Sequence, residues 1–194
     1  MGEAGGVSVS RAVSTSISAR LNKGEPLASR ILRVDHGGEN GAVHIYMAQI
    51  LVCSWRAPDI VAELREFQVH EERHRAAFAA ALRERGIRQR VGFSFCALGG
   101  FILGLITGLM GRAAVTATTR AVERVVLRHL HQQLAYLKSA DSAAYSIVAS
   151  ILDEEHGHYD STVLAAVSGG VWPSIVEPIV AGATEAVIWI GMHR

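Results

Sequence analysis

The sequence repeats one pattern of acidic and histidine residues at a fixed offset, and this pattern restricts the fold more than any other feature. Each copy has a lone glutamate that precedes a Glu-x-x-His motif, and the interval from Glu39 to Glu71 equals that from Glu123 to Glu155. The offset that moves Glu71 onto Glu155 also moves His74 onto His158. One such motif easily arises by chance, but two with matching spacing indicate an internal repeat.

The breaks between helical patterns predict how the repeat folds. The segments "SWRAPD" (54–59) and "KSADS" (138–142) lie midway between each lone glutamate and its partner motif. In an antiparallel helical hairpin, residues equidistant from the turn lie at the same height, and residues i and i+3 share a face. No strand-like alternation persists along the chain. We therefore expect an all-α, ferritin-like four-helix bundle built from two helical hairpins.

The second predicted helix, at about 60–85, places the motif within its apolar stripe. Leu64, Phe67 and Phe78 share the helical spacing of Glu71 and His74. Buried carboxylates without partners carry a high free-energy cost, which bound cations would remove. We therefore interpret the pattern as a metal site. Glu72 belongs to the charged face of this helix and is expected at the surface.

Four carboxylates and two imidazoles in such a bundle are typical of di-iron or di-manganese sites. Oxygen ligands with imidazole suit iron that cycles between Fe2+ and Fe3+, and the set lacks the thiolates typical of structural zinc. We predict two iron ions per chain, with Glu71 and Glu155 as bridging ligands. The predicted metal ligands, which are also catalytic through the metals, are Glu39, Glu71, His74, Glu123, Glu155 and His158.

Several residues near the pattern allow two interpretations. Gly37, Gly38 and Gly41 either let another backbone or a substrate approach closely, or reflect loose helix packing. Asp35 is either a hydrogen-bond acceptor for a ligand histidine or a helix N-cap. The remaining histidines that the pattern does not explain are predicted to be surface or hydrogen-bonded residues, namely His44, His70, His129 and His131.

Composition sets the domain organisation and the classes of partner. The 194 residues are 49% hydrophobic and 19% charged, which suits one domain with a sizeable core. Residues 1–26, rich in Ser, Gly and Ala and without a secretory signal, are expected to be a disordered tail before a domain at 27–194. Because the formal net charge is +1 and the chain has no basic stripe, we do not expect nucleic acid as a partner.

Two apolar segments predict contact with a membrane. Residues 91–111 carry no charge between Arg90 and Arg112, and an apolar run of that length can span a bilayer. A span would complicate the bundle topology. We therefore favour a peripheral protein whose apolar segments, 91–111 and 173–192, lie on the membrane surface. The alternatives are a buried crossover and an oligomer interface.

The motifs resemble those of the demethoxyubiquinone hydroxylase family of ubiquinone biosynthesis. The resemblance covers about 27–194 and is carried by "RVDHGGENGAVHIY", "EERH", "GLMGRAAVTATTRAVE" and "LDEEHGH". It implies the same six ligands and a di-iron monooxygenase that hydroxylates a polyprenylated benzoquinol, with O2 and an external reductant such as NADH. It also implies a homo-oligomer or quinone-biosynthesis complex at the cytoplasmic face of a bacterial inner membrane or the matrix face of a mitochondrial one.

This chain departs from the family pattern away from the ligands. Asn40 and Cys96 stand where the family often has aromatic or aliphatic residues, and "RHL" (128–130) lacks a family tyrosine. These positions bear on where the quinone ring would be hydroxylated. Two other functions fit the same ligands: a ferritin-like protein that handles iron or peroxide, and a non-enzymatic lipid-binding scaffold of a quinone-synthesis complex.

Overall fold

The computed structural model describes residues 17–88, 92–165 and 172–194. Within these ranges the chain forms six α-helices, one short 3-10 helix and no strand, which confirms the predicted all-α, ferritin-like class. The elements are α1 (Leu27–Arg56), η1 (Pro58–Ile60), α2 (Val61–Glu84), α3 (Gly92–Met110), α4 (Arg112–Ala140), α5 (Ser142–Ala165) and α6 (Trp172–His193).

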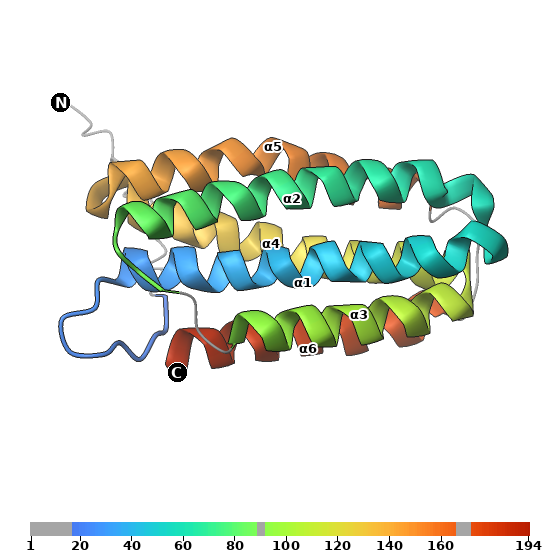
Figure 1. Ribbon diagram of the computed structural model, residues 1–194, viewed down its shortest axis with the longest axis horizontal. Coiled ribbons are helices and arrows are strands. Elements are labelled where there is room, and N and C mark those ends of the chain that lie inside the picture. Colours follow the sequence, from blue (N-terminus) through green and yellow to red (C-terminus); the bar gives the residue numbers. More distant parts are fainter. Residues whose placement is uncertain (1–16, 89–91, 166–171) are drawn as a thin grey trace, which may run out of the picture.

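Two antiparallel hairpins, α1–α2 and α4–α5, build the four-helix bundle (Figure 1). The first turn forms where Ala57 leaves the helical conformation and Pro58 begins the 3-10 helix. The second turn consists of Asp141, whose backbone is extended and whose carboxylate accepts a hydrogen bond from the Ala144 N–H at 2.9 Å. The predicted breaks therefore coincide with the observed turns.

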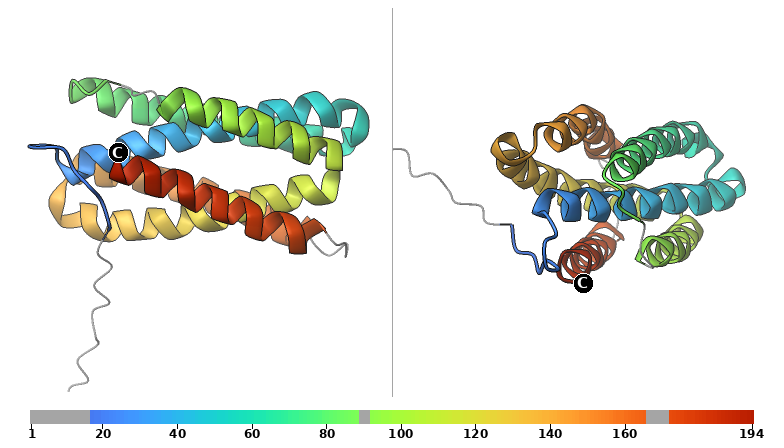
Figure 2. Two further views of the ribbon diagram at one scale, coloured as in Figure 1. Left: turned by 90° about the horizontal axis from the view of Figure 1, so that it is seen from below. Right: turned by 60° about the vertical axis from the view of Figure 1, so that its left-hand side comes forward.

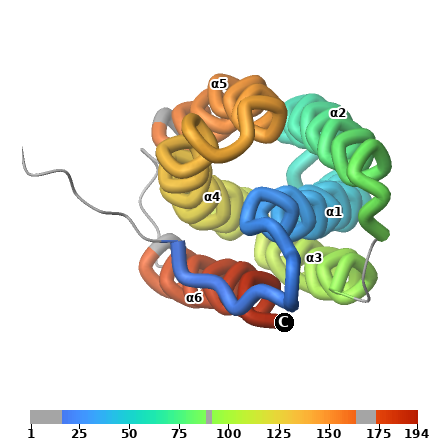
Figure 3. Tube along the Cα trace, turned by 90° about the vertical axis from the view of Figure 1, so that its left-hand side faces the viewer, coloured from blue at the N-terminus to red at the C-terminus, as the bar shows by residue number. Residues whose placement is uncertain are grey.

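The remaining long helices, α3 and α6, lie side by side on the faces of α1 and α4 that point away from α2 and α5 (Figures 2 and 3). Helix α3 packs mainly on α1, and α6 packs mainly on α4. In residue number, the interval that separates the two copies of the pattern also separates α3 from α6, almost in register. The repeated unit is thus three helices long, whereas the sequence pattern indicated only two.

A glycine seam brings α3 against α1. A Cβ atom at Gly100 would lie 2.2 Å from the carbonyl oxygen of Gly41, and one at Gly104 would lie 2.3 Å from that of Ile45. Glycine is required at both positions because the two backbones approach too closely for a side chain. For Gly41 the close-approach interpretation is therefore correct. Nothing lies within 4 Å of a Cβ atom built on Gly38.

The described residues before α1 run along the C-terminal end of α6. The Arg20 N–H donates to the Met192 carbonyl at 3.0 Å. Arg30, only 1% exposed, donates to Glu25 and to the carbonyls of Gly191 and Met192. Of the tail expected at 1–26, residues 1–16 lie outside the described residues, whereas Ile17 and Ala19 pack against the core and Glu25 bonds to Arg30.

The outer faces of α3 and α6 are apolar and exposed. Both helices are long and apolar enough to cross a membrane, by length and composition, and only 22% and 17% of their most apolar windows is buried. The most exposed large apolar side chains on these helices are Phe95, Leu98, Ile102, Ile106, Leu109, Ile175, Ile179, Val187, Trp189 and Ile190. A water-soluble core helix would bury such a window, so these faces have the character of an interaction surface.

Candidate metal centre

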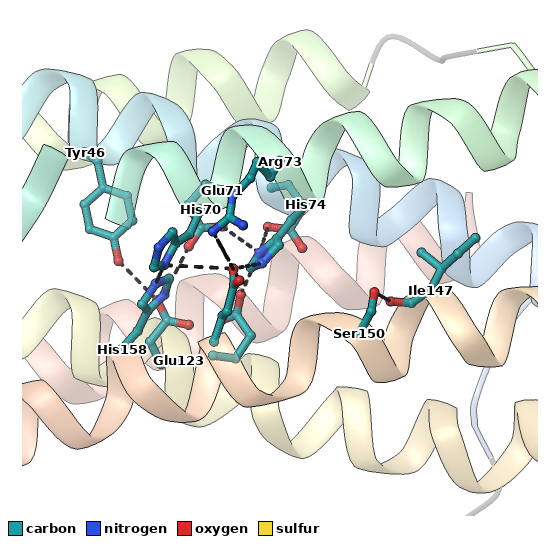
Figure 4. Close-up of polar contacts among 12 residues, drawn as sticks. Tyr46, His70, Glu71, Arg73, His74, Glu123, Ile147, Ser150 and His158 are labelled. Atoms are coloured by element: carbon teal, nitrogen blue, oxygen red, sulfur yellow. Dashed lines mark hydrogen bonds and ion pairs between the residues drawn. The ribbon is translucent and has the colours of Figure 1, made fainter. Parts of the chain in front are cut away.

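All six residues of the repeated pattern meet inside the bundle. Glu39 comes from α1, Glu71 and His74 from α2, Glu123 from α4, and Glu155 and His158 from α5. Each is at most 7% exposed. Because the two hairpins place these residues at the same height, every helix of the bundle contributes a carboxylate, as the spacing predicts. Figure 4 shows Glu71, His74, Glu123 and His158 gathered between the helices.

The six side chains form two overlapping groups that could each hold a metal ion. One group is Glu39, Glu71, His74 and Glu155, and the other is Glu71, Glu123, Glu155 and His158. Within each group the ligand atoms lie within 4.8 Å of one another. Glu71 and Glu155 belong to both groups, which is the arrangement expected of carboxylates that bridge two ions.

Both histidines turn the same ring nitrogen toward the carboxylates. His74 Nδ1 lies 3.1 Å from Glu155 Oε1 and 3.9 Å from Glu39 Oε2. His158 Nδ1 lies 3.4 Å from Glu71 Oε1 and 3.8 Å from Glu123 Oε1. The two histidines therefore present equivalent ligand atoms to the two groups.

Three buried atoms of this cluster make no hydrogen bond of acceptable geometry with the residues that the structure describes. They are His74 Nδ1, His158 Nδ1 and Glu155 Oε1. Buried polar atoms are nearly always satisfied, and an unsatisfied group costs about 1–3 kcal/mol. Lone pairs aimed at one interior volume from two sides fit a site for cations.

The electrostatics of the cluster also favour added positive charge. Burial, reinforced by Glu71, raises the pKa of Glu39 well above its usual value. Burial and the nearby Glu123 raise the pKa of Glu155 to about 8. Burial alone would lower the pKa of His158, but contact with Glu123 and Glu71 outweighs it and raises that pKa to about 10. The protein therefore gathers more negative charge here than its own cations balance.

Three residues that the sequence reasoning missed touch the cluster. The Tyr46 hydroxyl donates to Glu123 Oε1 at 3.2 Å, and both groups are buried. His70 Nδ1 lies 2.9 Å from His158 Nε2, so His70 is hydrogen-bonded to the site itself. Glu154 Oε2 lies 2.8 Å from His74 Nε2. His70 and Glu154 are related by the same offset as the two copies of the pattern, so the repeat could have identified them.

Two polar residues of α1 near the cluster, Asp35 and Asn40, bond to neighbouring helices and not to the ligands. Asp35 lies inside α1, which begins at Leu27, so the N-cap interpretation was wrong. Its Oδ1 accepts a hydrogen bond from Gln133 at 2.8 Å rather than from a ligand histidine. Asn40 bonds to Arg75 and to the Phe93 carbonyl, each at 2.9 Å, and so ties α1 to α2 and α3. Glu72 is exposed, as predicted.

Comparison with known proteins gives one consistent result. Residues 26–191 match the family model described as "Ubiquinone biosynthesis protein COQ7". A Dictyostelium discoideum protein named NADPH-dependent 3-demethoxyubiquinone 3-hydroxylase, mitochondrial, is 33% identical over 68% of this chain and 61% of its own length. A Rhodospirillum rubrum protein named 3-demethoxyubiquinol 3-hydroxylase is 31% identical over 84% of this chain and 77% of its own length. The match thus spans less than two thirds of the Dictyostelium protein.

Proposed function

Because the chain belongs to the ubiquinone biosynthesis protein COQ7 family, we propose that it hydroxylates the ring of a polyprenylated benzoquinol, a demethoxyubiquinol. The relatives named as demethoxyubiquinol or demethoxyubiquinone hydroxylases support this substrate class. The domain that carries the activity would be residues 27–194. The reaction adds one oxygen atom from O2 to the ring, and an external reductant supplies two electrons so that the second oxygen atom leaves as water.

The observation that carries the proposal is the pair of overlapping buried groups that share Glu71 and Glu155. Glu39 and His74 would complete one iron position, and Glu123 and His158 the other. Hard oxygen ligands with one imidazole per ion suit iron in both common oxidation states. When bound, the two iron ions would supply the redox chemistry that activates O2 with electrons from the reductant.

The chain's own residues hold and shield this chemistry. Tyr46 donates to Glu123 and fixes the orientation of that carboxylate. The Phe67 ring lies over His158, with ring centroids 4.3 Å apart, and contributes to an apolar wall. These contacts would hold the ligands in place around bound ions and limit the access of water to them.

The substrate and the reductant would reach the site from different environments. A polyprenylated quinol dissolves in a bilayer, and the exposed apolar faces of α3 and α6 support docking on a membrane surface. We place that surface at the cytoplasmic face of a bacterial inner membrane or the matrix face of a mitochondrial one. The words "NADPH-dependent" in the names of several relatives favour NADPH over NADH as the electron source.

The test is product analysis with purified, iron-loaded protein. Demethoxyubiquinol is incubated with 18O2 and a reductant, and the quinone is examined by mass spectrometry. We expect a product that carries one 18O atom from the wild type and from Glu72→Gln, which alters an exposed acid next to Glu71. The Glu123→Gln variant should give roughly 100-fold less product or lower still.

Other results would point to the alternatives. Iron oxidised and stored in large excess over two ions per chain, with no change in the quinone, would indicate an iron-handling protein. Quinone bound without oxygen incorporation, in a protein that holds two iron ions, would indicate a scaffold. Either result would overturn the proposed hydroxylase activity.

A further inference from the structure

The outward-facing nitrogens of the two site histidines have different partners. His74 Nε2 lies 2.8 Å from Glu154 Oε2, and His158 Nε2 lies 2.9 Å from His70 Nδ1. Glu154 also accepts from Arg73 Nη2 at 3.1 and 3.2 Å. The labelled side chains in Figure 4 show His70 beside His158, and Arg73 above the cluster near His74.

These two partners occupy equivalent positions of the repeat and act across it. His70 directly precedes Glu71, and Glu154 directly precedes Glu155, so the repeat relates them. Yet His70 on α2 contacts the histidine of α5, and Glu154 on α5 contacts the histidine of α2. Each hairpin therefore supports the ligand of the other hairpin, at the edge where α2 and α5 meet.

The proton positions follow from the inward-facing atoms. A histidine that binds a metal through Nδ1 must carry its ring proton on Nε2. His74 then donates that proton to the carboxylate of Glu154. His158 donates to Nδ1 of His70, which must be a neutral imidazole with its own proton on Nε2. The two contacts thus fix the tautomers of both ligands and the angles of both rings.

The partners are not equivalent in charge. A carboxylate acceptor makes the imidazole that donates to it a stronger metal ligand, and it adds a negative charge near the ion. A neutral imidazole acceptor strengthens the donating imidazole less, and it adds no negative charge near the ion. Arg73 screens Glu154 in part, and the Glu154 side chain is 32% exposed, so the difference is moderate.

We propose that Glu154 and His70 are positioning residues that make the two metal positions unequal, with tighter binding at the position of Glu39 and His74. This inference depends on the metal site proposed above and goes beyond it, because it assigns the order in which the two positions fill. At limiting metal, the first ion would occupy the His74 position and the second the His158 position.

The test is an anaerobic calorimetric titration with Fe2+. The wild type should bind two ions with two distinct dissociation constants. Glu154→Ala should weaken the tighter step about 10- to 100-fold, and His70→Ala should weaken the other step by up to about 10-fold. Glu154→Gln leaves a neutral acceptor on both sides and should bring the two constants to within about threefold. His70→Gln should recover most of the loss, because its side-chain oxygen can accept the same hydrogen bond.

A spectroscopic measurement separates positioning from general damage to the fold. In the Mössbauer spectrum of protein loaded with 57Fe2+, Glu154→Ala should shift one quadrupole doublet and His70→Ala the other. Glu72→Gln is the matched control and should change neither the constants nor the doublets. The unfolding temperature of each metal-free variant should stay near that of the wild type, because both side chains lie at the bundle edge.

The outcomes distinguish this inference from the proposal on which it rests. Two bound ions whose constants and doublets are unchanged in Glu154→Ala and His70→Ala would overturn the positioning roles and leave the metal site standing. The same would follow if each variant weakened both steps equally. A wild type that binds no Fe2+ would overturn both.

Discussion

Glu39 shows how a single residue can reveal a site. It lies on α1 near Val43 and Tyr46, both buried, where an isolated carboxylate would be costly. The structure places it beside Glu71 and Glu155. Burial is the main cause that raises the pKa of Glu39, and the negative charges of these two neighbours raise it further. The metal-free cluster is therefore electrostatically unfavourable, and bound cations would relieve it.

Asp35 offers a test of buried charge outside the ligand set. Burial raises the pKa of its carboxyl to about 7, although Gln133 opposes the shift, and its Oδ2 has no hydrogen-bond partner among the described residues. Since the unfolded chain loses this proton near pH 4, the unfolded state binds fewer protons between about pH 4 and 7. The unfolding free energy therefore falls as the pH rises through that window, because the buried Asp35 carboxyl must lose its proton or hold it at a cost.

We expect Asp35→Asn, which keeps the acceptor for Gln133, to remove this penalty. In metal-free protein, the gain in unfolding free energy should be about 2–3 kcal/mol larger at pH 8 than at pH 5. Urea unfolding of both proteins at the two pH values gives this double difference. A gain that is equal at both pH values would show that the pKa of Asp35 is not raised in the folded chain.

Sequence reasoning at the residue scale found the six clustered residues because two copies of one pattern repeat with the same spacing. It treated His70 as a surface or hydrogen-bonded residue and missed its contact with His158. Tyr46 was missed because an aromatic residue on an apolar helix face usually belongs to the core. Its hydrogen bond to Glu123 depends on how α1 and α4 pack, which no local pattern encodes.

At the scale of helices, the glycine seam between α1 and α3 is the most sensitive contact. We expect Gly100→Ala to lower the unfolding free energy by about 1–3 kcal/mol, because its Cβ would meet the Gly41 carbonyl and force the helices apart. Gly99→Ala is the matched control on the same helix. It has open space at Cβ and should stabilise α3 by up to about 1 kcal/mol.

Thermal unfolding of the two variants measures this contrast. Equal midpoints for Gly100→Ala and Gly99→Ala would mean that α3 does not pack on α1 as described.

The existence of the seam was only half predictable from sequence. Glycines in the α1 segment allowed a close approach as one of two interpretations, but the approaching partner, α3, lies in an apolar run with no charged residue to mark its orientation.

The whole molecule has one bundle and one apolar side. The sequence predicted the two hairpins, since their turns contain Pro58 and the polar stretch around Asp141. It did not predict that α3 and α6 are equivalent members of a three-helix repeat. Many apolar side chains can replace one another in such helices, so their sequences show no clear repeat. That α3 and α6 correspond to each other is therefore visible only in the fold.

The apolar side predicts how the molecule binds membranes. We expect the wild type to float with phosphatidylcholine–phosphatidylglycerol vesicles in a density gradient. The double variant Ile102→Glu and Ile179→Glu, with one charge on α3 and one on α6, should bind roughly tenfold more weakly or worse. Val69→Glu on α2, where the native side chain is 55% exposed, is the control and should float normally. Equal binding of all three proteins would exclude this side as the membrane contact.

The most direct test of the repeat-built site is the number of iron ions per chain after anaerobic loading with Fe2+ and removal of free metal. We expect close to two in the wild type and in Glu72→Gln, and a clear fall in Glu123→Ala, which removes a ligand from α4. Iron near zero in all three proteins, or an equal amount in the wild type and Glu123→Ala, would contradict this prediction. The repeat would then be only a feature of helix packing.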